Sequence, residues 1–327
     1  MRRGGKRQTL LVYILLWVLV LLPSLALMSY SLLRIATVQA ATERTQTVAP
    51  LATSLPAPSV TAVAAYLLDA DTGAVYYAKG ADEERPMAST TKIMTALLAV
   101  ERGNLDQVIT VGPDAQALVR HDSSYMGVTA GEQLTLRDLL YGLLLPSGND
   151  AAVAIADGIA GSQDAFVALM NARAAGLGLT HTHYANPHGL DAPDHYTTAR
   201  DLAMLAELAL QQPVIVQIAS TLHYSIPKTA THKAYELQTG NDLLAGARSP
   251  YPGAMGLKPG FTGGAGYTMA FAARRHGHLI IGAVLGDPSW QVRILDMRIL
   301  LNWGFEQYGI SKALPVNPGS QPVASDL

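Results

Sequence analysis

A serine and a lysine stand three residues apart at the start of a long apolar run in the stretch ASTTKIMTALLAV. The run predicts a buried helix with Ser89 as its N-cap. Residues three apart share a helix face, so the side chains of Ser89 and Lys92 can touch. The helix dipole and burial both disfavour a charged lysine there, and a neutral amine can take the proton of the Ser89 hydroxyl. This motif indicates a serine nucleophile, although a helix cap beside a solvated lysine is the more frequent meaning of so short a pattern.

Two further stretches place polar groups on rigid elements. The run LTLRDLLYGLLL predicts a helix that Pro146 ends, and NDAAVAIADGIAG predicts the next helix, with Asn149 or Asp150 as its cap. Ser147-Gly148-Asn149 fills the short loop between them. Farther on, GLKPGFTGGAG predicts a strand that carries Lys258, and its closely spaced glycines permit another backbone to approach. Taken singly, the Ser147-Gly148-Asn149 loop is a capped turn between helices, and the Lys258 stretch is a glycine-rich edge strand.

Together, and in this order, the SxxK, SGN and Lys258 motifs resemble those of the serine D,D-peptidase and β-lactamase superfamily. The similarity extends to low-molecular-mass penicillin-binding proteins that act as D-alanyl-D-alanine carboxypeptidases, peptidase family S11. The blocks that follow the order of that family are PMASTTKIMTALLA, GEQLTLRDLLYGLLLPSGNDAA, NPHGLDAPDHYTTARDLAMLA and GLKPGFTGGAGYTMAFAA. The resemblance covers about Val60 to Tyr308. It implies peptidoglycan stem peptides ending in D-Ala-D-Ala as substrates, β-lactam antibiotics as covalent inhibitors, and no cofactor.

The resemblance also implies catalytic roles. Ser89 attacks the carbonyl carbon of the terminal D-Ala-D-Ala bond and becomes an acyl-ester, while Lys92 accepts its proton. Ser147, held by Lys258, passes a proton to the leaving amine. Asn149 orients Lys92 and the amide of the substrate.

Substrate binding involves the Lys258 strand. By the resemblance, Lys258 places positive charge near the carboxylate of the substrate, and the backbone N–H groups of Ser89 and Phe261 stabilise the oxyanion. The chain departs from the family at Pro259, which replaces the threonine of the usual KTG motif and has neither a hydroxyl nor a backbone N–H. A proline requires that the N side of position 259 face solvent or the pocket. We expect Thr262 to supply the missing hydroxyl and the enzyme to be active.

The remaining pattern predicts the elements that position these groups. VTAVAAYLLDADTGAVYYAKG predicts two strands around a turn at Asp71-Thr72-Gly73, and helices dominate from Ser89 to about Gln212. GLKPGF, YTMAFAA and HLIIGAVL predict three late strands, and a helix follows from Trp290 to about Tyr308. Strands at both ends with helices between predict an α+β fold of the β-lactamase/transpeptidase-like kind. One antiparallel sheet is built from both ends of the domain, with an inserted helical lobe.

Histidines permit a different chemistry for the same substrate, because zinc D,D-peptidases exist. Four histidines and two aspartates gather in one turn-rich stretch, but no histidine pair there has the i, i+4 spacing of a helical zinc motif. We therefore expect no metal site. The residues concerned are His181, His183, His188, Asp191, Asp194 and His195.

Two further alternatives concern turnover. Glu207 in AELALQ resembles the deacylating glutamate of class A β-lactamases, but Leu202, Leu205 and Leu208 mark the buried face of that helix and place Glu207 on the solvated face. The SGN loop also differs from the SDN loop of those enzymes. A non-catalytic penicillin-binding wall receptor is the other alternative, and Pro259 is the only feature that favours it.

Composition excludes several other functions. The chain has 327 residues, of which 15% are charged, with a net charge of -2 and no cysteine. It therefore has no basic surface suited to nucleic acid, no disulfide and no cysteine nucleophile.

The N-terminal sequence predicts that the rest of the chain lies outside the cytoplasm. MRRGGKR carries four cations, and the apolar run from Thr9 to Leu33 is long enough to span the cytoplasmic membrane. Val38-Gln39-Ala40 is typical of a signal cleavage site, so a retained anchor and secretion after cleavage both stay open. We divide the chain into a signal peptide or N-terminal membrane anchor, a flexible stalk, a D,D-peptidase catalytic domain and a disordered tail, at residues 1–40, 41–59, 60–311 and 312–327.

Overall fold

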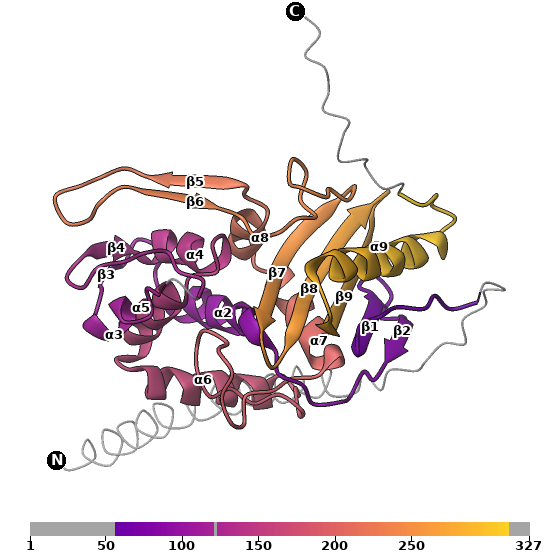
Figure 1. Cartoon of the computed structure of the whole chain (residues 1–327), viewed down its shortest axis with the longest axis horizontal. Coiled ribbons are helices and arrows are strands. Elements are labelled where there is room, and N and C mark those ends of the chain that lie inside the picture. Colours follow the sequence, from indigo (N-terminus) through magenta and orange to yellow (C-terminus); the bar gives the residue numbers. More distant parts are fainter. Residues whose placement is uncertain (1–55, 121–122, 314–327) are drawn as a thin grey trace, which may run out of the picture. The chain divides into compact units, whose positions relative to one another are not determined.

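A five-stranded antiparallel sheet joins the two ends of the folded unit in the computed structural model, which describes residues 56–120 and 123–313 (Figure 1). The strands lie in the order β2-β1-β9-β8-β7. Strand β1 pairs with β9 along its whole length, as expected for a sheet built from both ends of the domain. The strands are β1 Ala64–Asp69, β2 Val75–Lys79, β7 Ala254–Thr262, β8 Gly266–Arg275 and β9 His278–Asp287.

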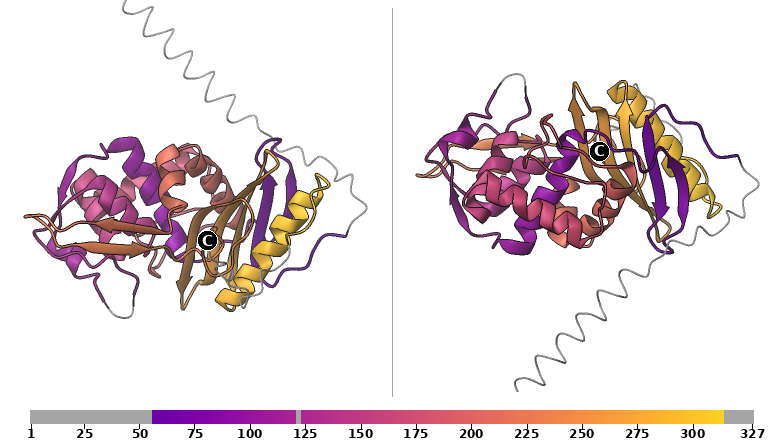
Figure 2. Two further views of the ribbon diagram at one scale, coloured as in Figure 1. Left: turned by 90° about the horizontal axis from the view of Figure 1, so that it is seen from above. Right: turned by 90° about the horizontal axis from the view of Figure 1, so that it is seen from below.

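Strand β1 shows that both faces of this sheet are covered. All six of its residues are buried. Because successive side chains of a strand point to opposite faces, Tyr66 and Leu68 pack with the helical lobe, whereas Ala65 and Leu67 pack with helix α9, Trp290–Glu306. Figure 2 shows α9 and the helical lobe on opposite sides of the sheet.

The inserted lobe packs around helix α2, whose first eight residues are all buried. A helix that is apolar on most sides belongs in the interior of a lobe, which is where the run after Lys92 lies. The helices of the lobe are η1 Ala88–Thr91, α2 Lys92–Arg102, α3 Pro113–Gln116, α4 Leu136–Leu144, α5 Asn149–Ala160, α6 Gln163–Gly176, α7 Ala199–Leu210 and α8 Pro213–Ala219.

Two short strand pairs have no counterpart in the sequence prediction. Strand β3, Val108–Thr110, pairs with β4, Gln133–Thr135, and β5, His223–Ile226, pairs with β6, Tyr235–Gln238. Strands of three or four residues contain too few alternations to give a periodic signal. The β5–β6 hairpin leads to Gly240, whose N–H donates to the Leu145 carbonyl just before the SGN loop.

Two helix starts differ from the prediction. Ser89 is not an N-cap, because it lies inside η1 and α2 begins at Lys92. Helix α5 begins at Asn149 after Gly148, which is the N-cap residue and makes no side-chain cap. The side chains of Asn149 and Asp150 make tertiary contacts instead, which a pattern of local capping residues does not reveal.

Both ends of the chain bear on the predicted boundaries. The predicted anchor and most of the stalk lie outside the described residues. At the other end, the buried Ala313 donates its N–H to Asn302 Oδ1 over 2.9 Å, so the packed chain passes the predicted boundary at residue 311. Within the described ranges no single helix is long and apolar enough to span a membrane. Two sharply bent helix pairs, α5 with α6 and α7 with α8, reach the required length and apolar composition together, by length and composition alone.

The central position of α2 predicts a large difference between two leucine truncations. Leu98 is fully buried on α2, so Leu98→Ala should lower the free energy of unfolding by about 2–5 kcal/mol. Leu295 on α9 is 55% exposed, and Leu295→Ala should change the free energy of unfolding by less than about 0.5 kcal/mol. Urea unfolding followed by circular dichroism measures both, and equal losses would contradict this placement.

Candidate active site

Ser89 lies on a tight turn at the start of α2 and faces a cleft of about 920 Å³. Ala88, which precedes it, has a φ of 49°, in the left-handed region that residues with a side chain seldom adopt. The Ala88 carbonyl accepts the Thr91 hydroxyl over 2.8 Å. The turn leaves Ser89 half-exposed in the cleft, while Ala88 and Thr90 on either side are buried.

The buried Lys92 amine contacts three oxygens. Its Nζ lies 2.7 Å from Asn149 Oδ1, 2.5 Å from the His188 carbonyl oxygen and 3.0 Å from Ser89 Oγ. Amide and carbonyl oxygens only accept, so Asn149 and His188 occupy the two N–H groups of a neutral amine. The nitrogen lone pair then remains for Ser89, the only partner of the three with a proton to donate. The predicted contact between Ser89 and Lys92 is formed.

Burial favours the neutral form of this lysine. Desolvation lowers the pKa of Lys92 well below its ordinary value, and the positive charge of Lys258 lowers it further, against the opposite pull of Asp150. The three hydrogen-bond partners of Nζ within the described residues are uncharged. An ammonium would therefore be buried without a carboxylate in contact with it, which is unfavourable.

The SGN loop also lines the cleft. Ser147 has a φ of 66°, and its buried hydroxyl has no hydrogen-bond partner within the described residues. The predicted contact between Ser147 and Lys258 is thus not made. Gly148 is required by its surroundings, because a Cβ there would lie 2.8 Å from the Gly142 carbonyl oxygen and 2.9 Å from Met126 N.

Asp150 holds the backbone that runs beside the SGN loop. Its carboxylate is buried and accepts the N–H groups of Met126, Gly127 and Val128 over 2.7–3.0 Å. The preceding residue, Asn149, donates its own N–H to the Ser124 carbonyl. The same helix turn therefore orients the Lys92 acceptor and fixes the segment that carries Ser123 and Ser124 into the cleft.

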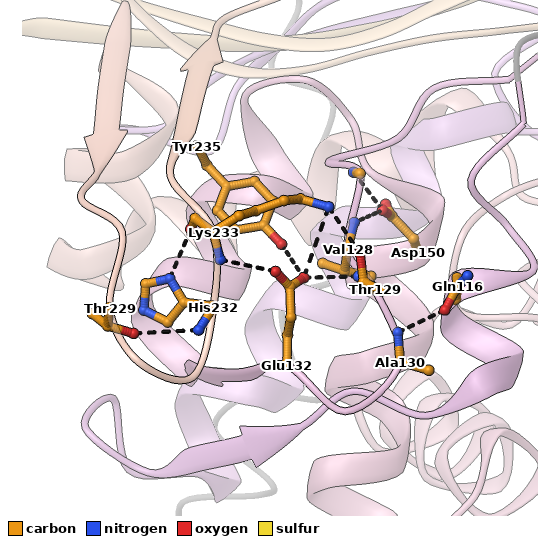
Figure 3. A network of polar contacts seen from close by, with 11 residues as sticks. Gln116, Val128, Thr129, Ala130, Glu132, Asp150, Thr229, His232, Lys233 and Tyr235 are labelled. Atoms are coloured by element: carbon orange, nitrogen blue, oxygen red, sulfur yellow. Dashed lines mark hydrogen bonds and ion pairs between the residues drawn. The ribbon is translucent and has the colours of Figure 1, made fainter.

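Glu132 connects that segment to the β5–β6 hairpin (Figure 3). Its carboxylate accepts the N–H groups of Thr129 and Lys233 and the hydroxyl of Tyr235. Burial alone would raise the pKa of Glu132, but these hydrogen bonds lower it overall. An ionised Glu132 thus fixes the hairpin whose end, Gln238 to Gly240, lines the cleft.

Strand β7 is the edge strand of the sheet and carries Lys258 to the cleft. The Lys258 ammonium is buried and donates to the Pro259 carbonyl over 2.9 Å. Burial, together with the nearby Arg293, lowers the pKa of Lys258 to about 7. The edge position meets the condition predicted for Pro259, since an edge strand can hold a proline without losing a ladder hydrogen bond.

Gly260 brings β7 against the nucleophile turn. A Cβ at this position would lie 2.9 Å from Ser89 N, so only glycine permits this approach. N–H directions alternate along a strand, and the Phe261 N–H therefore points to the same side of β7 as the Pro259 nitrogen. This arrangement suits the predicted pair of oxyanion donors, Ser89 N–H and Phe261 N–H.

Two arginines of the cleft were missed by the sequence analysis. Arg293 on α9 is buried, its guanidinium donates to backbone carbonyls of β7 and β8, and its Nε has no partner within the described residues. Arg248 lies over the Trp290 ring, 4.9 Å from its centroid. With Lys258 they give the cleft three cationic side chains. No short sequence motif marks either arginine as a site residue, and their positive charge is the only property in the sequence that points to such a role.

The histidines that suggested zinc have other partners. His195 Nδ1 accepts the Ala185 N–H, so its Nε2 carries the proton and donates to Thr91 Oγ1 over 2.8 Å. Burial lowers the pKa of His195 to about 4, which keeps it neutral. His181 pairs with Glu84 at the surface. Among residues 56–120 and 123–313, no three His, Cys, Asp or Glu side chains gather as metal ligands.

Thr262 lines the cleft, but its hydroxyl hydrogen is already engaged. It donates to Asp191 Oδ1 over 2.6 Å, so the predicted role in binding the substrate carboxylate does not fit this geometry. The partners lie 71 residues apart, and no local pattern links them. Glu207 lies on α7 outside the cleft, which leaves Asp191 as the only carboxylate among the described residues that line it.

The chain is similar in sequence to known proteins. A family model described as D-alanyl-D-alanine carboxypeptidase matches residues 51–289. The D-alanyl-D-alanine carboxypeptidase DacC of Escherichia coli K12 is 35% identical over 271 residues, which cover 80% of this chain and 65% of that protein. The D-alanyl-D-alanine carboxypeptidase of Streptomyces sp. strain K15 is 37% identical over 267 residues, which cover 78% and 90% of the two chains. The chain thus spans slightly less than two thirds of DacC.

Solved structures extend the likeness to the fold. The crystal structure of the Streptomyces K15 DD-transpeptidase has a TM-score of 0.72 at 34% identity and covers 77% of this chain and 100% of that one. A D-alanyl-D-alanine carboxypeptidase from Mycobacterium tuberculosis H37Rv has a TM-score of 0.69 at 33% identity, with 78% and 95% covered. The chain belongs to the D-alanyl-D-alanine carboxypeptidase family of serine peptidases and has its β-lactamase/transpeptidase-like fold.

Proposed function

We propose that the chain is a serine D,D-carboxypeptidase that removes the terminal D-alanine from peptidoglycan stem peptides through an acyl-enzyme. The observation that carries this proposal is the placement of the Lys92 amine. It is buried 3.0 Å from Ser89 Oγ, and two purely accepting oxygens occupy its N–H groups. A neutral amine held in this way is a base directed at one hydroxyl.

Acylation uses this base. Ser89 Oγ attacks the carbonyl carbon of the penultimate D-alanine while its proton moves to Lys92 Nζ. The carbonyl oxygen becomes an oxyanion, which the N–H groups of Ser89 and Phe261 stabilise. The C–N bond then breaks, Ser147 passes its proton to the leaving nitrogen of D-alanine, and the proton held on Lys92 restores the Ser147 hydroxyl. Water then hydrolyses the ester: its hydroxyl group goes to the acyl carbon, its proton restores the Ser89 hydroxyl, and the shortened peptide is released.

We expect the cationic side chains of the cleft to confer specificity for a free C-terminus. A carboxylate that enters the cleft meets Lys258 and Arg293, both buried and both lining it. The unpartnered Nε–H of Arg293 supports a role in this contact, because a buried donor without an acceptor is unfavourable. Lys258 and Arg293 thus take the place of the threonine that Pro259 replaces, and Asn149 retains its amide for the substrate backbone.

The location of the substrate agrees with the N-terminal sequence. Peptidoglycan lies outside the cytoplasmic membrane, and a basic segment followed by a long apolar run directs a chain across that membrane. The proposed enzyme is therefore extracytoplasmic, anchored by its N-terminal segment or secreted after cleavage.

A covalent penicillin adduct tests the nucleophile and the base. A β-lactam presents a strained amide in place of the terminal peptide bond, so penicillin should acylate Ser89, and peptide mass spectrometry should locate it there. Lys92→Ala should slow acylation by about 100-fold or more, because the general base is lost while the fold remains. An adduct that persists in Ser89→Ala would show that another residue is the nucleophile.

The two lysines predict a bell-shaped pH profile of kcat/KM for a diacyl D-Ala-D-Ala peptide. Lys92 must be neutral, so activity falls as the pH drops through its lowered pKa. Lys258 must be charged to bind the carboxylate, so activity falls as the pH rises above about 7 in the free enzyme. In Lys258→Arg the charge persists, and the alkaline limb should move to higher pH. If the alkaline limb does not move, a group other than Lys258 controls it.

Slow release of penicillin distinguishes the alternatives. Asp191, the only carboxylate that lines the described cleft, already accepts two hydrogen bonds and is poorly suited to activate a deacylating water. The enzyme should therefore release D-alanine from the peptide yet hold penicillin for minutes or longer. Rapid penicillin hydrolysis would favour a β-lactamase. An adduct without D-alanine release would favour a wall receptor, and inhibition by a chelator instead of penicillin would favour zinc.

A further inference from the structure

A short loop, residues 186–191, connects the two sides of the active site. Its backbone is braced by Asn186, whose Oδ1 accepts the N–H groups of His188 and Gly189 over 3.2 and 2.6 Å. The Asn186 Nδ2 donates to the Leu190 carbonyl over 2.9 Å. Three hydrogen bonds from one side chain hold the loop in one shape, so its two ends keep a fixed separation.

The middle of this loop contacts the base and the nucleophile turn. The His188 carbonyl is one of the two acceptors of the Lys92 amine. Gly189 has a φ of 93°, and a Cβ there would lie 2.0 Å from the carbonyl oxygen of Ala88, which precedes the nucleophile. The loop therefore lies in direct contact with the segment that presents Ser89.

The last residue of the loop binds the end of β7. Asp191 Oδ1 accepts the Thr262 hydroxyl over 2.6 Å, and Oδ2 accepts the Gly264 N–H over 3.0 Å. Thr262 Oγ1 in turn accepts the Ala265 N–H over 3.0 Å. Because Thr262 directly follows Phe261, the Asp191 carboxylate is bonded to the strand end that carries the proposed oxyanion donor.

We propose that Asp191 is a positioning residue for acylation, which acts through Thr262 to hold the Phe261 N–H in place relative to Ser89 and Lys92. The inference rests on the proposed function. It also gives the Thr262 hydroxyl a different role from the carboxylate contact expected from the sequence.

This role differs from substrate binding in its kinetic signature. Among the described residues no hydrogen bond or ion pair joins Asp191 to Lys258 or Arg293, the proposed carboxylate ligands. An oxyanion donor stabilises charge that develops only in the transition state. Loss of the Asp191–Thr262 bond should therefore lower kcat and the rate of penicillin acylation, while KM for the peptide stays near its original value.

The experiment compares four variants of the full chain. Asp191→Asn keeps the volume but can accept only one of the two bonds, and Thr262→Val removes the hydroxyl at constant shape. Each should lower kcat and the penicillin acylation rate by about ten- to a hundredfold, with KM within about twofold. The double variant should lose no more than the worse single variant, because both remove one link. Thr262→Ser should recover most of the kcat that Thr262→Val loses.

Asp194→Asn is the matched control in the same region. Asp194 is exposed, and asparagine tolerates its φ of 56°. This variant should retain the kcat of the original chain. Thermal unfolding of every variant separates positioning from folding, and the Thr262→Ser and Thr262→Val pair decides the question if Asp191→Asn unfolds.

Three results would overturn the proposal. They are a raised KM with unchanged kcat in Thr262→Val, which would return the hydroxyl to carboxylate binding; additive losses in the double variant; and losses in kcat that follow the unfolding temperature. Failure of the proposed function is distinguishable, since the original chain would then release no D-alanine and form no adduct at Ser89.

Discussion

A lysine amine buried without a carboxylate in contact with it is the constraint on which the rest of this site depends. Removing an ammonium from water is costly, so the interior favours the neutral form of Lys92. A neutral Lys92 can act as a base toward Ser89 only if its lone pair points at the Ser89 hydroxyl. The Asn149 amide oxygen and the His188 carbonyl bind the two N–H groups and leave the lone pair for Ser89. Burial thus favours a base, and the two acceptors give it a direction.

These acceptors come from distant parts of the chain. Asn149 begins α5, 57 residues after Lys92, and His188 lies 96 residues after it, in a loop between α6 and α7. The central α2 permits this, because helices packed around it deliver their ends to its first turn. The pairing of β1 with β9 then fixes β7 at the edge of the same sheet, beside that turn. A peptide substrate can lie along such an edge, where backbone groups are unpaired.

The replacement of the motif threonine by Pro259 is tolerated for a structural reason. The edge of the sheet does not require a donor from position 259. Positive charge in the cleft is supplied by Lys258 and Arg293, which are both buried. Burial, and after it the charge of Arg293, lowers the pKa of Lys258. In the proposed function an incoming carboxylate offsets the repulsion between these cations, which favours a substrate with a free C-terminus.

The sequence by itself determined the longer elements and predicted the chemistry. Apolar periodicity predicted the three late strands, the first hairpin, the buried α2 and the long final helix, since each spans enough residues to show its period. The spacing of Ser89 and Lys92 predicted their contact because three residues of helix fix it. Only the tertiary structure decided the partners of side chains distant in sequence. It brought Arg293 into the cleft, left Ser147 without its expected partner, and engaged the Thr262 hydroxyl with Asp191. Hydrogen bonds between residues distant in sequence depend on how whole helices and strands pack, and local sequence patterns do not predict that packing.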